Sequence, residues 1–358
     1  MDFKPLQSWI PHLKQPLVIA GPCSAENENQ VLETARLVAG IPNVKVFRSG
    51  IWKPRTRPGG FEGVGKKGLQ WLKQVKEETG LLTTVEVAKP EHVEQAVKAG
   101  IDILWIGART VVNPFSVQEL AEALSGINIP ILIKNPVNPD IKLWAGAIER
   151  FQKTGNDTIA AVHRGFSQLG KSGYRNPPMW EIAIDLMRLM PGLPMLCDPS
   201  HISGNPALIQ EVSQQALDLE MQGLMIETHI DPPHALTDAR QQLTPLKLRE
   251  VIESLVIREQ GAGEVERDLQ KLRSDIDSID DQMIRLLADR MKIAEEMGLY
   301  KYAHNITILQ LRRWKQLFAD RMAKGEEQGL NHKFLANLLR LVHEESIQIQ
   351  TNVMKKDK

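Results

Sequence analysis

Residues 17–26 read LVIAGPCSAE, an apolar run that ends at Gly21-Pro22 and then presents a cysteine, Cys23. The run predicts a buried β-strand that stops abruptly, because glycine and proline interrupt regular structure. A single cysteine in such a place is most often a small buried apolar side chain. Later apolar runs in this chain end in the same way, each at a polar residue, so Cys23 is predicted to belong to a ring of polar groups.

Eight apolar runs alternate with helix-like segments over the first 258 residues. The expected strands cover residues 17–21, 44–47, 81–87, 103–106, 129–133, 158–162, 195–197 and 223–226. The expected helices cover residues 28–39, 65–79, 90–99, 117–124, 141–154, 179–190, 205–219 and 245–258. This alternation predicts an α/β fold, the (β/α)8 TIM barrel, in which catalytic groups gather at the carboxyl ends of the strands.

Composition limits the partners of the protein. The chain has 358 residues, so two domains are expected, and its 44 Lys+Arg balance its 44 Asp+Glu. This balance argues against nucleic acid or an anionic membrane as a partner. Two cysteines cannot form a disulfide framework, which favours the cytoplasm. The chain has neither an apolar run of about 18 residues nor a signal-peptide pattern, so no membrane association is expected.

The polar residues at the strand ends form two chemical groups. The first offers a thiol, an imidazole and a carboxylate from Cys23, His201 and Glu227, with Asp231 or Asp238 as a further oxygen donor. Such a mixed donor set suits a divalent transition metal ion better than calcium or magnesium. Each residue alone is as well explained as a buried polar group with hydrogen-bond partners, but several ligand types at converging strand ends favour a metal site.

The second group is cationic and comprises Arg48, Lys53, Arg55, Arg109, Lys134 and Arg164. Cations that end apolar strands need anionic partners, and Glu86 alone cannot pair with all of them. Phosphates or carboxylates of small substrates would satisfy them, since arginine binds both with two parallel hydrogen bonds. A solvated rim of charge is the alternative.

Seven short motifs now stand in order along the barrel: GPCSAE, FRSG, KPRT, GAR, HRG, DPSH and IETH. Together they resemble the 3-deoxy-D-arabino-heptulosonate 7-phosphate (DAHP) synthases, in the compact type I beta form, over about residues 17–258. The resemblance implies a metal-dependent condensation of phosphoenolpyruvate with erythrose 4-phosphate, the first step of the shikimate pathway. The implied cofactor is one divalent transition metal ion, Mn²⁺ first, with Fe²⁺, Co²⁺ or Zn²⁺ as alternatives.

The same resemblance implies roles for individual residues. The implied metal ligands are Cys23, His201, Glu227 and Asp238, the last chosen over Asp231 because it lies in the ALTD segment. The implied phosphoenolpyruvate site comprises Arg48, Lys53, Glu86, Arg109, Lys134 and Arg164. The implied erythrose 4-phosphate site comprises Lys53, Pro54, Arg55 and Thr56, with Lys53 as a catalytic residue.

Two other interpretations of the barrel stay open. The related 3-deoxy-D-manno-octulosonate 8-phosphate synthases share the GPC motif and the cation set but differ at the KPRT segment. A barrel that only binds a sugar phosphate is a further alternative, and the complete ligand set argues against it.

The last hundred residues follow a different period. Residues 259–264 are expected to be a linker, and residues 265–358 a three-helix domain. Apolar positions 265, 269, 272, 276, 279, 283 and 286 form a heptad seam, which predicts a helix of about 38 residues that pairs with a second copy. Arg290 and Lys301 fall within roughly 20° of each other on this stripe and so indicate a buried anion. Snorkelling, or a register-setting role in the seam, is the alternative for each cation alone.

Further helices are expected at about residues 309–325 and 332–351. The LR, DR, YK, RR and SxxxQ motifs in this order resemble the all-helical chorismate mutases, which are intertwined dimers. The implied chorismate pocket comprises Arg290, Lys301, Arg313, Ser346 and Gln350, with Arg273 from the partner and with Lys301 and Gln350 as catalytic donors to the ether oxygen.

The chain departs from that family at two positions, because acidic residues are common there and this sequence has Gln310 and Trp314. The contact to the substrate hydroxyl is therefore open. The helical part is either a second enzyme that converts chorismate to prephenate, or a dimerising sensor through which one of these compounds inhibits the barrel.

Overall fold

The computed structural model describes residues 2–53, 59–170, 172–258 and 264–355, and for Glu264 and Val265 it describes the backbone only. The chain divides into two units, Met1–Arg258 and Glu259–Lys358. The predicted (β/α)8 barrel and the helical region after it are both confirmed. Each unit is described below by itself.

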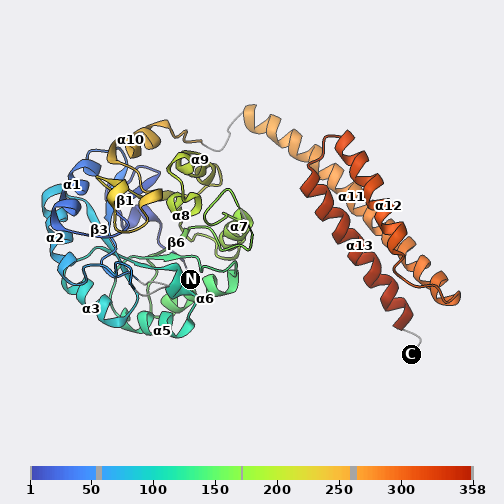
Figure 1. Ribbon diagram of the computed structural model, residues 1–358, viewed down its shortest axis with the longest axis horizontal. Coiled ribbons are helices and arrows are strands. Elements are labelled where there is room, and N and C mark those ends of the chain that lie inside the picture. Colours follow the sequence, from blue (N-terminus) through green and yellow to red (C-terminus); the bar gives the residue numbers. More distant parts are fainter. Residues whose placement is uncertain (1, 54–58, 171, 259–263, 356–358) are drawn as a thin grey trace. The chain divides into compact units, whose positions relative to one another are not determined.

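Eight parallel strands form a closed barrel in the order β1 to β8, with helices around the outside (Figure 1). The strands are β1 (Leu17–Gly21), β2 (Val44–Arg48), β3 (Leu82–Val87), β4 (Ile103–Ile106), β5 (Ile131–Lys134), β6 (Ile159–His163), β7 (Met195–Cys197) and β8 (Gly223–Glu227). Barrel closure pairs Leu17 with Gly223 and Gly21 with Glu227, which puts the ends of β1 and β8 side by side.

The barrel unit also contains these α-helices: α1 (Glu28–Ala39), α2 (Lys67–Thr79), α3 (Pro90–Lys98), α4 (Ala108–Val111), α5 (Pro114–Ala123), α6 (Ile141–Lys153), α7 (Trp180–Leu189), α8 (Pro199–Ser203), α9 (Ile209–Asp218) and α10 (Pro245–Ser254). Its described residues also form four short 3-10 helices: η1 (Leu6–Ser8), η2 (Pro206–Leu208), η3 (Pro232–His234) and η4 (Ala239–Gln241). The single-turn helices α4 and α8 were not predicted, because one turn leaves no periodic signal in a sequence.

Side chains alternate between the inside and the outside of the barrel, as a strand period of two requires. On β1, Leu17 and Ile19 belong to the inner core cluster, whereas Val18 and Ala20 belong to the outer cluster beneath the helices. Leu6, near the amino terminus, also belongs to the inner cluster. The packed interior leaves the carboxyl ends of the strands as the place where polar side chains can gather.

The last barrel helix is shorter than predicted. We expected it to reach residue 258, but α10 ends at Ser254, and Leu255 has the extended backbone of a β-strand (ψ 135°). Val256 and Ile257 beyond it are more than half exposed, so no packing holds these residues in a helix.

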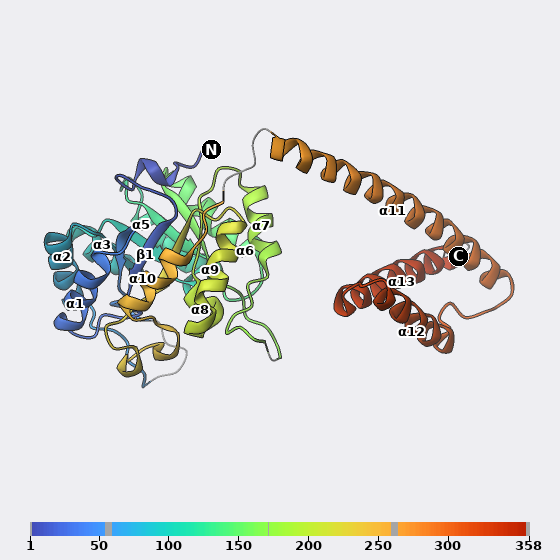
Figure 2. The ribbon, with the colours of Figure 1, turned by 90° about the horizontal axis from the view of Figure 1, so that it is seen from above.

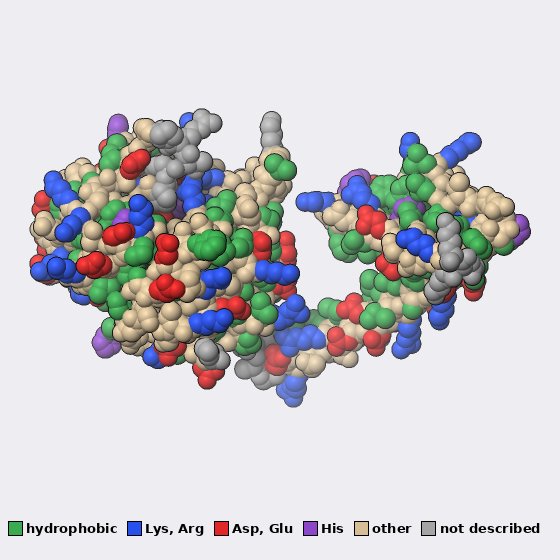
Figure 3. All heavy atoms as spheres, turned by 90° about the horizontal axis from the view of Figure 1, so that it is seen from below, with side chains coloured by type: hydrophobic (Ala, Val, Ile, Leu, Met, Phe, Trp, Pro, Cys, Tyr) green, Lys and Arg blue, Asp and Glu red, His purple; other side chains and the backbone are tan. Residues whose placement is uncertain are grey.

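The second unit consists of three helices: α11 (Glu264–Ala303), α12 (Leu311–Glu327) and α13 (His332–Lys355). Helix α13 lies against the carboxyl-terminal part of α11, α12 lies against α13, and the first turns of α11 extend beyond them (Figure 2). Every residue from 267 to 290 is exposed, although the heptad seam lies in this stretch. Figure 3 shows hydrophobic side chains at the surface of this unit.

Among the helices of the described residues, none combines the length and the hydropathy that crossing a membrane would need.

Candidate active sites and metal centre

Three of the predicted barrel site residues continue the inner phase of their strands. Arg48 lies two positions beyond Val46, Lys134 two beyond Leu132, and Glu227 two beyond Met225, each at the carboxyl end of its strand. Since alternate residues face the same side, these side chains point towards the barrel axis just above the apolar interior. All three are buried.

Three predicted metal ligands lie together in this ring. One ligand atom each from Cys23, Glu227 and Asp238 lies within 4.8 Å of the others, and Cys23 Sγ lies 3.4 Å from Asp238 Oδ2. The fourth, His201, is adjacent, with Nε2 at 3.8 Å from Glu227 Oε1 and 3.9 Å from Asp238 Oδ2. The alternative oxygen donor, Asp231, is exposed and pairs with His234 at 2.8 Å instead.

The orientation of His201 follows from the DPSH segment. Asp198 is the N-cap of α8, and one of its carboxylate oxygens accepts the backbone N–H of His201 at 3.0 Å. The same carboxylate lies 2.8 Å from His201 Nδ1, which leaves Nε2 facing Glu227 and Asp238. A carboxylate behind a histidine in this way fixes its tautomer and ring orientation in metal sites.

The donor set fits a divalent transition metal ion. Burial, together with Glu227 nearby, raises the pKa of the Cys23 thiol to about 12 in the metal-free protein. Burial also favours a neutral Asp238, but His201 and Arg175 outweigh it and hold the pKa of this carboxyl below its usual range. A buried thiol, an imidazole and two carboxylates match a cation that accepts sulfur, nitrogen and oxygen donors.

Buried cations surround this centre. Arg48 Nη2 donates to Glu227 Oε1 at 3.1 Å, and Arg48 Nη1 lies 4.0 Å from Asp198 Oδ2. Burial alone would lower the pKa of Arg48, but Glu227 and Asp198 raise it above its ordinary value. Lys134 Nζ donates to Asp198 Oδ2 at 2.6 Å, and burial lowers the pKa of Lys134. The predicted substrate cations Arg48 and Lys134 therefore contact protein carboxylates.

The other predicted cations lie near the same mouth with fewer partners. Burial lowers the pKa of Arg164 to about 10, although Asp198 opposes this, and the positive charges of Arg175 and Arg109 add to it. Three guanidinium groups close enough to repel one another form a site that an anion would stabilise. Arg109 is exposed. Glu86 is buried beside Gly107, where an added Cβ would lie 2.0 Å from its Oε1.

Lys53 connects the cations to the metal centre. Its Nζ donates to the Cys23 carbonyl oxygen at 3.1 Å and lies 3.3 Å from Cys23 Sγ. The next three residues of the predicted erythrose 4-phosphate segment, Pro54, Arg55 and Thr56, lie outside the described residues.

Sequence reasoning missed the groups that hold these ligands in place. Asp198 orients His201, Gln241 Nε2 donates to Glu227 Oε2 at 2.6 Å, and Arg175 Nη1 donates to Asp238 Oδ1 at 3.0 Å. The strand pattern could have identified Asp198, since it continues the inner phase of β7 two positions after Leu196. Arg175 lies in a loop, where no periodicity marks it.

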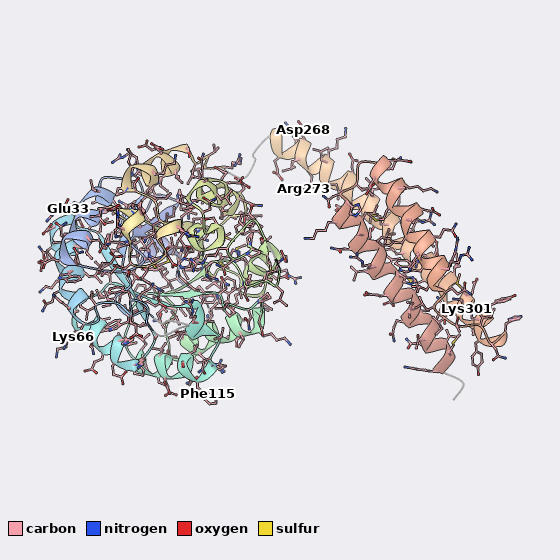
Figure 4. All side chains as sticks on the ribbon, in the orientation of Figure 1. Glu33, Lys66, Phe115, Asp268, Arg273 and Lys301 are labelled. Carbon is pink, nitrogen blue, oxygen red and sulfur yellow. The ribbon has the colours of Figure 1, made fainter. Side chains whose placement is uncertain are left out.

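The helical unit brings together four of the predicted chorismate residues (Figure 4 labels Lys301). Lys301 Nζ donates to Gln350 Oε1 at 2.9 Å and to the Ile308 carbonyl oxygen at 2.7 Å. Arg290 Nη1 donates to Ser346 Oγ. Burial lowers the pKa of both Lys301 and Arg290, as is expected for cations with no carboxylate beside them.

Two predicted chorismate residues do not join this group. Arg273 lies towards the other end of α11 in Figure 4, where it pairs with Glu266 at 2.7 Å. The 28 residues between Arg273 and Lys301 correspond to about 42 Å of helix. Arg313 is exposed, and within the described part of the chain it makes no hydrogen bond or ion pair.

Comparison with known proteins assigns a family to each part of the chain. A model described as the DAHP synthetase I family matches residues 12–260, and one described as chorismate mutase type II matches residues 272–351. The phospho-2-dehydro-3-deoxyheptonate aldolase of Thermotoga maritima is 30% identical over 238 residues, which cover 66% of this chain and 68% of that protein. A crystal structure of the T. maritima enzyme is similar with a TM-score of 0.60 at 28% identity, covering 73% of this chain and 70% of that one.

A second class of relatives is also similar to part of this chain. The 2-dehydro-3-deoxyphosphooctonate aldolase of Desulfatibacillum aliphaticivorans is 30% identical over 260 residues, which cover 67% of this chain and 90% of that protein. The DAHP synthetase I family model nevertheless matches 249 of the 358 residues. The chain therefore belongs to the DAHP synthetase I family, and it is an enzyme whose barrel domain is followed by a chorismate mutase domain.

Proposed function

We propose that the barrel condenses phosphoenolpyruvate with erythrose 4-phosphate to give DAHP, with a divalent transition metal ion held by Cys23, His201, Glu227 and Asp238. The observation that carries this proposal is the contact between Lys53 and Cys23, because it joins an anion-binding cation directly to the metal ligand set. Mn²⁺ is the first choice of metal, and Fe²⁺, Co²⁺ and Zn²⁺ also suit these donors.

In this proposal, the metal ligands and the cationic residues have different roles. When bound, the metal ion would supply Lewis-acid polarisation of the sugar aldehyde. Arg109, Lys134 and Arg164 would hold the phosphate of phosphoenolpyruvate, while Arg48 and Lys53 would hold its carboxylate, with Glu86 close by. Lys53, Pro54, Arg55 and Thr56 would receive erythrose 4-phosphate. Fixing two anions in a reactive pose removes their translational entropy before the chemistry begins.

The competing function uses a five-carbon sugar phosphate, as in 3-deoxy-D-manno-octulosonate 8-phosphate synthesis. One assay separates the two: phosphoenolpyruvate consumption with erythrose 4-phosphate against arabinose 5-phosphate, each with added Mn²⁺. We expect turnover with the four-carbon sugar only, and preferential use of arabinose 5-phosphate would overturn the proposal. Cys23→Ala should remove metal-dependent turnover, whereas Cys197→Ala, at a buried cysteine outside the ligand set, should keep the activity.

We propose that the helical domain rearranges chorismate to prephenate as a homodimer. Lys301 and Gln350 would donate to the ether oxygen as charge develops on it, and Arg290, Arg313, Ser346 and Arg273 of the partner subunit would hold the rest of the molecule. The pairing of Lys301 with Gln350 supports this, because both side chains are buried and Gln350 also contacts Ser346, to which a second cation, Arg290, donates. The exposed seam of α11 supports the dimer.

A sensor that binds chorismate or prephenate without converting it is the second candidate, favoured by the absence of acidic residues at Gln310 and Trp314. Chorismate loss measured with wild type, Lys301→Ala and Lys292→Ala decides between them, since Lys292 is exposed on the same helix. We expect loss of turnover only in Lys301→Ala. Equal, negligible rates in all three proteins would favour the sensor. Feedback is tested by adding chorismate or prephenate to the barrel assay.

We place the enzyme in the cytoplasm, because its two cysteines are free and buried.

A further inference from the structure

An aromatic stack joins α12 to α13 beside the proposed chorismate pocket. The rings of Trp314 and His343 lie 3.6 Å apart between centroids and only 5° from parallel. Trp314 also contacts Phe318, with centroids 5.4 Å apart. A ring held on a face in this way has little freedom to turn, so the direction of the imidazole edge is fixed.

The helix periodicity places His343 on the pocket side of α13. Ser346 and Gln350 follow it by three and seven residues, the spacing of side chains on one helix face. The residue before it, Val342, offers its carbonyl oxygen to Arg290 Nη1 at 3.4 Å. His343 therefore shares a face of α13 with Ser346 and Gln350, the residues that contact Arg290 and Lys301 of α11.

The state of the ring follows from its surroundings. Burial lowers the pKa of His343, and the positive charge of Arg290 lowers it further; Glu344 opposes this, and Lys301 adds a smaller lowering effect. Trp314, which faces the ring from α12, is neutral. The imidazole is thus uncharged at neutral pH.

One ring atom has no partner. His343 Nε2 is shielded from solvent, and within the described residues it makes no hydrogen bond. A buried polar nitrogen without a partner costs free energy that a bound ligand would recover. A neutral group of the ligand suits this nitrogen, because the cations of the pocket already bind the negatively charged groups.

We propose that His343 is a substrate-binding residue of the mutase pocket that hydrogen-bonds the ring hydroxyl of chorismate through Nε2, and that Trp314 is its positioning residue. The inference rests on the proposed mutase function. A hydroxyl group both donates and accepts, so it can pair with either tautomer of the neutral ring. This contact would replace the one lost where Gln310 and Trp314 stand in place of acidic residues.

The test compares chorismate with an analogue that lacks the ring hydroxyl, using kcat/KM for wild type and for His343→Phe. Phenylalanine keeps an aromatic ring on Trp314 but has no ring nitrogen to form a hydrogen bond. Wild type should prefer chorismate by about tenfold, the usual value of one neutral hydrogen bond, and His343→Phe should lose this preference. If the variant lowers both rates equally and keeps the preference, the histidine is merely structural and the inference is overturned.

Controls separate the inference from the function on which it rests. Glu344→Gln, at the exposed neighbouring position, should keep both the rate and the preference. If wild type does not rearrange chorismate at all, the mutase proposal itself fails. If wild type is active, Lys301→Ala is inactive and His343→Phe retains the preference, only the role of His343 is wrong. Should the phenylalanine variant fail to fold, His343→Leu, which also has no hydrogen-bonding group at this position, supplies the same comparison.

Discussion

The Nδ1 atom of His201 lies 2.8 Å from a carboxylate oxygen of Asp198, and this contact directs Nε2 of the same ring towards Glu227 and Asp238. We expect Asp198→Asn to weaken metal binding by about 10- to 100-fold, the usual effect of removing such a partner. Titration of the metal-free protein with Mn²⁺ measures the change.

The same substitution also leaves Lys134 without its carboxylate, so a lower melting temperature is expected as well. The titration must therefore be made where circular dichroism shows the variant folded. Asp185→Asn, at an exposed ion pair on α7, is the matched control and should bind metal as wild type does. Unchanged affinity in folded Asp198→Asn would show that the contact does not orient a ligand.

Metal binding should depend steeply on pH. Because burial and Glu227 raise the pKa of Cys23 to about 12, this thiol carries a proton at neutral pH that the metal must displace. The affinity should then rise about tenfold for each pH unit between 6.5 and 8.5. Mn²⁺ dissociation constants across this range, with proton release measured in two buffers, check the slope. The Cys23→Ser variant should bind Mn²⁺ weakly, and its affinity should lose most of the dependence on pH. An equal slope in that variant would mean that the displaced proton comes from another group.

The sequence predicted the barrel because strand phase and strand ends are local patterns. Arg48, Lys134 and Glu227 each continue the inner phase of an apolar strand, so their convergence needed only the closure of the sheet. The ion pairs that these residues form could not be predicted, because each pair joins side chains far apart in the chain. Lys134 was predicted to serve a substrate phosphate, and in the structure it contacts Asp198.

The contacts within the helical domain were harder to predict from the sequence, for a different reason. The heptad pattern predicted α11, but it could not show that Trp314 and His343 would stack, since the two lie on separate helices. Arg273 also stays apart from Lys301 in the single chain, as a pocket completed by a second copy would require. Arg313 was predicted in the pocket of its own chain, but it is exposed and makes no hydrogen bond or ion pair within the described residues.

Acid should destabilise the barrel through His163. This residue has the outer phase of β6 and lies among aromatic rings, with centroids 5.1 Å from Trp180 and 5.6 Å from Phe166. Burial lowers its pKa to about 3, so the folded protein leaves it neutral while the unfolded chain protonates it below about pH 6.5. Its contribution is therefore fully present above that pH and is lost, by about 1.4 kcal/mol per unit, as the pH falls towards 3.

His163→Phe keeps an aromatic ring but removes this titration. Urea unfolding of wild type and variant at pH 7, 6 and 5 measures the difference in their free energies of unfolding, in which the carboxylates common to both cancel. The difference should move in favour of the variant by about 1.4 kcal/mol between pH 6 and 5. A difference that stays constant with pH would mean that His163 is not buried in its neutral form.

The last prediction concerns the exposed seam of α11. Ile279 is 56% exposed in the single chain, and a second copy packed on the seam would bury it. Ile279→Asp should therefore give monomers in light scattering and lower chorismate turnover by about 100-fold, because Arg273 would no longer reach the pocket of a partner. Leu246→Asp, on the equally exposed surface of α10, should change neither property.

Mixed dimers test the shared pocket directly. Arg273→Ala and Lys301→Ala should each be inactive alone, but a dimer of the two holds one pocket with both residues intact. Random pairing on co-expression should thus restore about a quarter of the wild-type turnover, since half the dimers are mixed and each has one working site. If the co-expressed variants stay inactive while light scattering shows dimers, Arg273 of one copy does not complete the Lys301 pocket of the other. The shared pocket is then wrong, because the two residues lie too far apart along α11 to belong to one pocket within a single chain.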